Sequence, residues 1–375
     1  MTKSRRVLIG AVVISVAAAS LRFDELAGDP GIYRDRMALL FDGQVPYVDF
    51  FYEHLPLAII PMAVPWLLGG AFGEILYTVL FAVLMALCLY ATLSLVERVG
   101  DRIMVEQSGM RWVAVAGLLF PIVLFRYDPV PVLLVMVSVV GFLGTRGRVA
   151  AWSASVGVLV KGWPMVLAMT EWWRGRHWRA AGLVALALTM TALLALPGFS
   201  RVRAFSGIHS ETFFGGIFTL FRLRAGSSFQ LITDAGATYV AVPVWAIVAN
   251  LTLGVLLLAL ALYKAVGEFS WDRGVRLLAA ATLAILIGSP LLSPQFLLWP
   301  TPFLALHSKP VVRRLAIGVS LLTLLYMLGW NPGFEGDLWW VGVMNLRNLV
   351  LVVLGVAASM TVTGGGRGSL ATPTT

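Results

Sequence analysis

Long apolar runs recur along almost the whole of this 375-residue chain, and they restrict its fold more than any other feature. Each run has roughly 15–24 residues, about the length that a helix needs to cross the hydrocarbon core of a membrane. Only 13% of the residues are charged, and the mean hydropathy is +0.87. The runs lack the alternation and the polar faces of barrel strands, so helices must satisfy the backbone hydrogen bonds. The sequence therefore predicts an all-α, polytopic integral membrane protein.

The formal charge of the chain is +9, and two explanations are binding to a polyanion such as nucleic acid and the orientation of membrane helices. Arg and Lys cluster in the short loops between apolar runs, the pattern that orients membrane helices. We therefore expect membrane lipids, and no nucleic acid, around these charges. Cys88, the only cysteine, lies inside an apolar run, which excludes a disulfide framework and a thiolate metal cluster. No metal or nucleotide cofactor is expected, since the histidines lack metal-ligand spacing and no Gly-rich phosphate loop follows a strand.

The first apolar run, residues 7–21, follows a basic segment at residues 3–6. A signal peptide is the alternative, with Ala17 near its small-residue end, but the chain that follows is itself membrane-bound. We therefore predict an uncleaved first span with a cytoplasmic N-terminus, because positive residues stay on that side. Residues 22–73 then form a long first outer loop that carries helices lying on the membrane.

Whether residues 56–70 cross the membrane decides the side of every later loop. The segment is apolar but short, and three prolines interrupt it. If it crosses, the basic clusters at residues 146–148, 174–179 and 309–314 fall outside, against the positive-inside rule. We therefore place residues 56–70 in the outer interface and the three basic clusters in the cytoplasm.

About 12 membrane helices, two of them short, follow from this topology. The two short helices meet near residues 161–164, which places Lys161 in the outer half of the membrane. Residues 1–363 form a single domain, and the Gly-rich tail 364–375 is predicted to be a disordered cytoplasmic end. The predicted spans are 7–21, 74–96, 111–125, 129–145, the pair within 149–173, 180–197, 240–263, 275–290, 295–307, 311–329 and 340–361.

Acidic residues concentrate in the first outer loop. Residues 22–54 hold seven of the 19 acidic residues of the chain: Asp24, Glu25, Asp29, Asp35, Asp42, Asp49 and Glu53. Asp29 precedes residues 34–40, which suit a short helix on the membrane surface. A carboxylate there can cap the helix N-terminus. It can equally act as a general base toward an attacking hydroxyl, and residue chemistry alone leaves both interpretations open.

Six short segments stand out in the chain: Asp29-Pro-Gly-Ile-Tyr33, Gly43-Gln-Val-Pro-Tyr47, Glu53-His-Leu-Pro-Leu57, Arg126-Tyr-Asp-Pro129, Lys161-Gly-Trp-Pro164 and Ser293-Pro-Gln-Phe-Leu-Leu-Trp299. In this order they resemble glycosyltransferase family 87, the polyprenol-phosphate-mannose-dependent mannosyltransferases of the GT-C superfamily. The resemblance extends over residues 22–300. His54 and Leu55 depart from the commonest family pattern, an acidic residue before an aromatic-Pro-Pro-Leu turn.

The resemblance implies a GT-C-like helical bundle and an inverting sugar transfer at the outer face of the cell membrane. The donor is then a polyprenyl-phosphate sugar, with mannose implied, and the acceptor is a hydroxyl group of a glycolipid or glycan. No cofactor is implied. By the same resemblance Asp29 is the catalytic general base. It also implies that Asp49 and Glu53 bind acceptor or sugar hydroxyls, and Tyr33, Tyr47 and His54 of the same segments are further candidates for substrate binding.

The leaving group of such a reaction is a lipid phosphate, which a positive residue near the outer interface stabilises. The candidates are Lys161, Arg126 and His209, and Asp128, in the same segment as Arg126, is a further candidate for substrate binding. Lys161 lies within an apolar hairpin, where a charged side chain is costly and therefore suggests a function. The alternatives are that Lys161 snorkels to the interface or pairs with Asp128.

Two other polar segments are candidates for substrate binding. Gln295, between two proline-bounded turns, either hydrogen-bonds the sugar or satisfies the carbonyls of a broken helix. His209 and Glu211, in the outer segment 198–239, lie where related enzymes have a donor-side element.

Other functions compete with this interpretation. Within the same class, the sugar can be arabinofuranose or glucose. From another class, a transporter or flippase would use buried charges to line a path and the first outer loop as a lid. A non-catalytic lipid-binding scaffold is a third candidate. Transporters seldom concentrate their carboxylates in the first outer loop, and the other predicted spans are nearly free of acidic residues, which favours the transferase.

Overall fold

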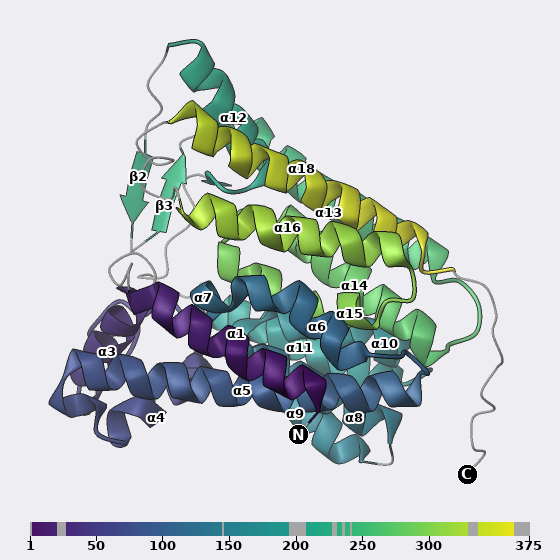
Figure 1. The fold of residues 1–375 in the computed structure, drawn as a ribbon, viewed down its shortest axis with the longest axis horizontal. Coiled ribbons are helices and arrows are strands. Elements are labelled where there is room, and N and C mark those ends of the chain that lie inside the picture. The colour runs from purple at the N-terminus through teal and green to yellow at the C-terminus, as the bar shows by residue number, and fades with distance from the viewer. Residues whose placement is uncertain are drawn as a thin grey trace.

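Helices make up most of the computed structural model, as predicted for an all-α chain (Figure 1). The structure describes residues 2–20, 28–144, 146–194, 208–226, 231–234, 237–240, 242–328 and 337–363. The predicted disordered tail 364–375, and Asp24 and Glu25 of the acidic loop, lie outside the described residues. The account below concerns the described part of the chain.

Four of the described helices are long and apolar enough to cross a membrane. They are α5 (Glu74–Arg102), α13 (Val244–Lys264), α16 (Pro310–Leu328) and α18 (Leu338–Met360). At 1.5 Å per residue, helices of this length match a hydrocarbon core of about 30 Å. The structure therefore agrees with the prediction of a membrane protein.

Most of the remaining helices lie in segments predicted to be helical, but α12 (Phe213–Arg224), within the predicted outer segment 198–239, was not predicted. Two of the remaining helices, α1 (Lys3–Ser20) and α14 (Trp271–Gly288), have 18 residues with three charged side chains among the first six. The other α-helices are α3 (Gly28–Phe41), α4 (Ile59–Leu67), α6 (Ser108–Ala116), α7 (Phe120–Val123), α8 (Pro129–Leu143), α9 (Gly147–Lys161), α10 (Leu167–Trp173), α11 (His177–Leu194), α12 (Phe213–Arg224) and α15 (Thr301–Leu306). Short 3₁₀ turns are η1 (Pro56–Ala58), η2 (Gly70–Phe72), η3 (Gly117–Leu119), η4 (Trp163–Val166) and η6 (Pro294–Leu298).

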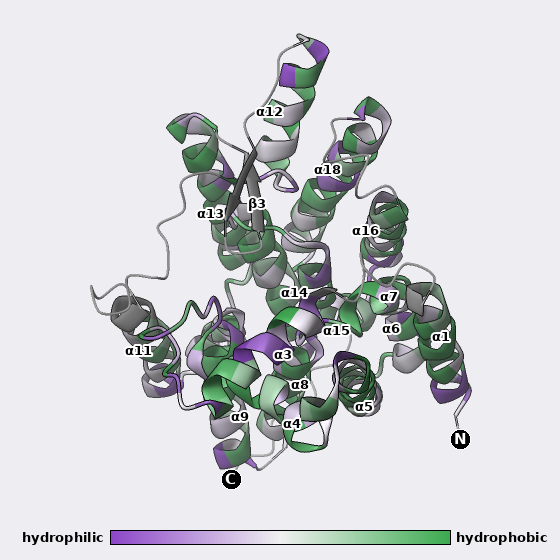
Figure 2. Cartoon of the chain, turned by 90° about the vertical axis from the view of Figure 1, so that its left-hand side faces the viewer, coloured by the Kyte–Doolittle hydropathy of each residue, from purple (hydrophilic) through white to green (hydrophobic). Residues whose placement is uncertain are grey.

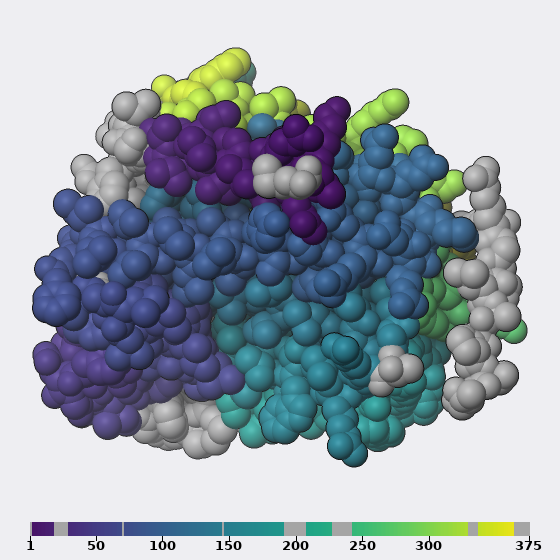
Figure 3. All heavy atoms as spheres, turned by 60° about the horizontal axis from the view of Figure 1, so that its bottom comes forward, coloured from purple at the N-terminus to yellow at the C-terminus, as the bar shows by residue number. Residues whose placement is uncertain are grey.

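The predicted first outer loop contains two helices, α3 and α4, at one end of the molecule, with α10 at the other (Figure 1). In the space-filling view this segment, violet to blue, packs as a continuous block against the teal part of the chain (Figure 3). Hydrophilic residues gather on α3, whereas the neighbouring α4, α5 and α9 are mainly hydrophobic (Figure 2). Helix α4 has nine residues, about 14 Å of length, which is too short to cross a membrane.

The chain breaks at Gly162 between α9 and η4, as predicted for two short helices that meet near residues 161–164. Gly162 has φ of +64°, in the left-handed region that glycine adopts without strain. Pro164 then stands in the first turn of η4 and cannot continue the preceding helix. The break leaves Lys161 in the last turn of α9.

A small antiparallel sheet was not predicted. Its strands are β1 (Ile208–His209), β2 (Leu231–Asp234) and β3 (Ala237–Val240), in the order β1-β3-β2. Ile208 pairs with Val240 and His209 with Tyr239, while Leu231 also pairs with Val240. These strands of two to four residues are too short for the alternation that reveals a strand in sequence.

Candidate functional site

Helix α3 directs Asp29 toward the protein. Pro30, Tyr33 and Met37 are buried along one face of α3, so Asp29 in the first turn lies beside the Tyr33 side chain one turn later. The Tyr33 hydroxyl donates to Asp29 Oδ2 at 3.2 Å, and Arg126 Nε forms an ion pair with the same oxygen at 2.6 Å. Neither contact is to a backbone N–H of α3, so the described contacts of Asp29 do not support the helix-cap interpretation.

Three consecutive residues between α7 and α8 connect the site. Arg126 pairs with Asp29, and the Tyr127 hydroxyl lies 3.3 Å from His54 Nδ1. The Asp128 carboxylate accepts from Lys161. One tripeptide therefore joins the Asp29 carboxylate, the loop that carries His54, and the end of α9.

Lys161 pairs with Asp128, which was the alternative to a free functional lysine. Its Nζ donates to both carboxylate oxygens at 2.8 Å, and Trp299 Nε1 donates to Asp128 Oδ1 at 2.6 Å. The Nζ also lies 4.4 Å from the centre of the Tyr127 ring and 4.5 Å from that of Phe296. The pair joins the positive end of one helix dipole to the negative end of another, since Asp128 precedes α8 and Lys161 ends α9.

His54 lies among aromatic rings. The rings of Tyr33, Tyr52 and Tyr127 meet it edge-on at 5.1–5.6 Å between centroids. Burial, and then the charges of Lys161 and Arg36, lower the pKa of His54 to about 3. His54 is therefore a neutral hydrogen-bonding group, not a counter-charge for a phosphate. The Tyr47 hydroxyl donates to the His54 carbonyl and so fixes the loop that carries the imidazole.

Glu53 is the second carboxylate of this cluster. Its Oε2 lies 3.6 Å from Arg36 Nε, and its Oε1 lies 3.7 Å from His54 Nε2. Burial, assisted by the Asp29 carboxylate, raises the pKa of Glu53 in spite of Arg36. Glu53 Oε2, Arg36 Nε and His54 Nε2 are buried atoms without hydrogen-bond partners among the described residues. Two donors and an acceptor in this arrangement suit a hydroxyl group of a sugar.

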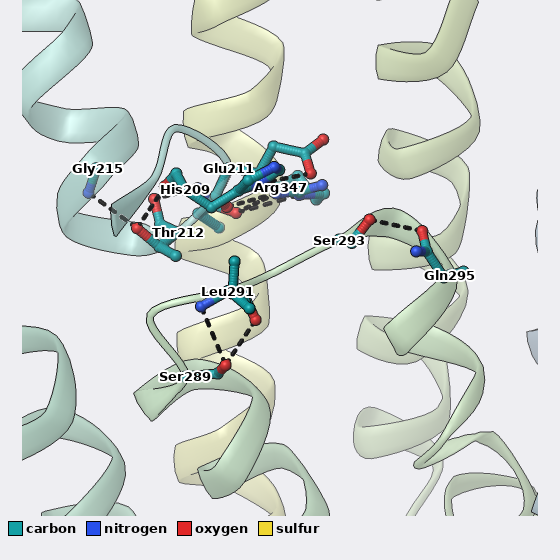
Figure 4. Close-up of polar contacts among 10 residues, drawn as sticks. His209, Glu211, Thr212, Gly215, Ser289, Leu291, Ser293, Gln295 and Arg347 are labelled. Carbon is teal, nitrogen blue, oxygen red and sulfur yellow. Dashed lines mark hydrogen bonds and ion pairs between the residues drawn. The ribbon is translucent and has the colours of Figure 1, made fainter. Parts of the chain in front are cut away.

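Asp49 and Gln295 are held locally. Asp49 is exposed and accepts from the Val45 backbone N–H at 2.7 Å, which closes the turn before it. Gln295 Oε1 accepts from the Ser293 hydroxyl at 2.6 Å, at the start of η6 (Figure 4). The same turn carries Phe296 and leads to Trp299, so η6 links Gln295 to the Lys161–Asp128 pair.

His209 and Glu211 belong to a separate polar cluster with Arg347 of α18 (Figure 4). His209 Nδ1 lies 3.1 Å from Glu211 Oε2, and Glu211 is fully buried. Arg347, also fully buried, donates to the Glu211 backbone carbonyl at 2.7 Å and to Asn348 Oδ1 at 2.8 Å. Ser293 and Gln295 lie on a different segment in this view, bonded to each other. Except for Asp49 and Gln295, which are held locally, the predicted site residues therefore divide between two clusters.

The first cluster contains most of the predicted residues and several that sequence reasoning missed. The predicted members are Asp29, Tyr33, Tyr47, Glu53, His54, Arg126, Asp128 and Lys161. The missed members are Arg36, Tyr127, Phe296 and Trp299. The last three stand inside the segments that carry the family resemblance, but nothing in the sequence indicates that their rings surround Lys161. Arg347 had a signal, because it is a lone basic residue within a predicted span.

No group of three or more His, Cys, Asp or Glu side chains is placed to hold a metal ion within the described ranges. The chain matches no protein-family model and no curated protein. The interpretation of the site therefore depends on the geometry of the first cluster and on the resemblance of the six segments.

Proposed function

We propose that this protein is an inverting glycosyltransferase of the GT-C type. It moves a sugar, with mannose as the first candidate, from a polyprenyl phosphate to a hydroxyl group of a lipid or glycan. The observation that carries the proposal is the position of Asp29. Its side chain is 31% exposed, both described contacts fall on Oδ2, and the cations of Arg126 and Lys161 belong to the same cluster. The reaction needs these two elements, a base and a counter-charge.

In the proposed step the acceptor oxygen attacks C1 of the sugar while its proton passes to Asp29 Oδ1. The bond from C1 to the phosphate oxygen breaks, and its electron pair leaves with the polyprenyl phosphate. Because the new bond forms on the opposite face of C1, the configuration inverts. Arg126 supplies positive charge to the departing phosphate, and Lys161 keeps its ion pair with Asp128. The groups proposed to bind hydroxyls are Tyr33, Tyr47, Asp49, Glu53, His54 and Gln295.

The finer topology belongs to the same proposal. The chain crosses the cell membrane about 12 times, with two short spans, and presents α3 and α4 on the outer face. The shortness of α4 and the break after Lys161 support this arrangement. The polyprenyl chain then stays in the bilayer while its headgroup reaches the cluster around Asp29.

A transporter or flippase is the second candidate, and one observation favours it. Arg347 and Glu211 are fully buried, and Arg347 lies inside a helix long enough to span the membrane. Buried charges of this kind often mark a transport path. However, Arg347 donates to the Glu211 backbone, and Asn348 Nδ2 donates to the Thr212 carbonyl at 3.1 Å. These bonds fix residues 211–212 to α18, so Arg347 has a structural role.

Turnover of a labelled donor tests the proposal. Purified protein in nanodiscs is incubated with polyprenyl-phosphate mannose, labelled in the sugar, and a glycolipid extract. We expect label in the acceptor, inverted configuration at C1, and release of polyprenyl phosphate. Glucosyl and arabinofuranosyl donors are assayed in parallel and separate the sugars. Movement of donor lipid between leaflets without cleavage would instead identify a flippase.

A further inference from the structure

Every cation of the first cluster already faces a carboxylate. Arg126 pairs with Asp29 at 2.6 Å, Lys161 with Asp128 at 2.8 Å, and Arg36 with Glu53 at 3.6 Å. A phosphate that enters this cluster must therefore take a cation away from its present partner. The cost of that exchange depends on the carboxylate that is left behind.

Moving Lys161 from Asp128 to a phosphate would cost much free energy. Asp128 is 1% exposed and accepts two hydrogen bonds from Lys161 and one from Trp299. If Lys161 moved to a phosphate, Asp128 would remain as a buried charge with no water to replace the ammonium. Removing one member of such a pair is strongly unfavourable, so this pair is expected to stay closed when the donor binds.

Moving Arg126 from Asp29 to a phosphate would cost less free energy than moving Lys161. Asp29 is 31% exposed, so water can solvate its carboxylate when the guanidinium leaves. The Arg126 Nε contacts one oxygen of Asp29, whereas Lys161 binds both carboxylate oxygens of Asp128. A guanidinium also matches the oxygens of a phosphate with two parallel N–H groups.

Inversion prevents Arg126 from serving both partners at once. The base takes its proton on the face of C1 where the acceptor attacks, and the phosphate leaves from the opposite face. Resting on the proposed function, we propose that Arg126 exchanges Asp29 for the donor phosphate, so that donor binding releases the carboxylate that acts as the base. In the protein without donor, Arg126 stays paired with Asp29. The donor must therefore bind before the acceptor can react.

The test measures the binding of polyprenyl phosphate, without its sugar, to the full-length chain in nanodiscs. Arg126→Ala is expected to weaken binding by about tenfold or more, because it removes a charge-assisted contact. Asp29→Asn is expected to tighten binding about three- to fivefold, because it removes the group that competes for the arginine. With Arg126 already replaced by alanine, adding Asp29→Asn is expected to leave the affinity unchanged.

Arg34 and Asp35 provide a matched control pair on the same helix, 3.6 Å apart and more exposed. Arg34→Ala and Asp35→Asn are expected to change the affinity by less than about twofold. Binding of neutral polyprenol measures the contribution of the lipid chain alone, and thermal melting confirms that each variant folds. Arg126→Lys is a second variant, which keeps the charge without the planar fork and is expected to bind with intermediate affinity.

The outcomes separate the inference from the proposed function. Tightening by Asp29→Asn that persists in the Arg126→Ala background would indicate plain repulsion and would overturn the exchange. Polyprenyl phosphate that binds equally well to wild type and Asp29→Asn would also overturn it, while leaving the transferase proposal intact. If the wild-type protein bound polyprenyl phosphate no better than polyprenol, both the exchange and the transferase proposal would be contradicted.

Discussion

At the residue scale, burial changes the basicity of two neighbouring side chains in opposite directions. It raises the pKa of Glu53 above its ordinary value of 4.5 and lowers the pKa of His54 to about 3. In both cases a low-dielectric surrounding disfavours the charged form. His54 is therefore neutral across the physiological range, and Glu53 is the group of this pair whose charge depends on pH.

This difference predicts a pH-dependent stability. Because the folded pKa of Glu53 lies above the unfolded value, its contribution to stability is full below pH 4.5 and is lost as the pH rises through the folded pKa. We expect Glu53→Gln and wild type to melt together near pH 4, and wild type to melt a few degrees lower by pH 8. Melting in detergent from pH 4 to 8 measures this, and a gap that does not change with pH would contradict it.

Sequence reasoning found the charged members of the first cluster except Arg36, and the one pairing that it named, as an alternative, was that of Lys161 with Asp128. Asp29, Arg126 and Lys161 stand out because charges are rare in this chain. Which cation meets which carboxylate depends on the packing of α3 against the segment before α8, which has no signature in the sequence. The aromatic rings around Lys161 were missed for the same reason, since Trp and Phe are common in apolar runs.

At the element scale, close helix packing depends on small residues. A Cβ on Gly254 of α13 would lie 2.5 Å from the Gly288 Cα and 2.7 Å from the Ala284 carbonyl oxygen, both backbone atoms of the α14 region. Backbone cannot move aside as a side chain can, and small residues commonly allow such contacts between membrane helices.

Gly254→Ala is therefore expected to force α13 and α14 apart and to destabilise the protein by about 1–3 kcal/mol. Gly342→Ala in α18 is the control, because a Cβ there meets nothing within 4 Å. We expect it to be neutral or slightly stabilising, since alanine is the better helix former. Equal melting temperatures for the two variants would show that the α13–α14 contact tolerates a methyl group.

Most helices could be predicted because apolar runs and prolines mark where they begin and end. The breaks within the predicted spans were harder to predict. The predicted span 295–307 is in fact a 3₁₀ turn, η6, followed by the six-residue α15. Its prolines at 294, 300 and 302 give the physical reason, since each removes a backbone donor. The hydrogen bonds from Arg347 and Asn348 to residues 211–212 join segments 136 residues apart, which no local pattern reveals.

At the scale of the whole molecule, topology follows from α4. With nine residues, α4 is too short to cross, so the proposed topology puts the basic clusters that follow in the cytoplasm. Single cysteines in a Cys88→Ala background test this with an impermeant thiol reagent. We expect labelling at positions 29 and 293 and protection at 146, 176 and 313. Labelling of 146 and 176 from outside would place α4 across the membrane.

The central claim is that Asp29 is the general base, and one substitution tests it most directly. Asp29→Asn keeps a side chain that caps helices well but cannot accept the acceptor proton. We expect turnover of polyprenyl-phosphate mannose to fall about 10²–10⁴-fold, while melting changes little and polyprenyl phosphate still binds.

The comparison variants are Asp35→Asn, which removes a carboxylate from the exposed side of α3, and Glu53→Gln. Asp35→Asn is expected to retain the wild-type rate, and Glu53→Gln to lose less activity than Asp29→Asn. The measurement is the initial rate of sugar transfer by each folded variant at saturating donor. An Asp29→Asn enzyme that keeps more than about a tenth of the wild-type rate, beside an inactive Glu53→Gln enzyme, would assign the base to Glu53 and contradict the account.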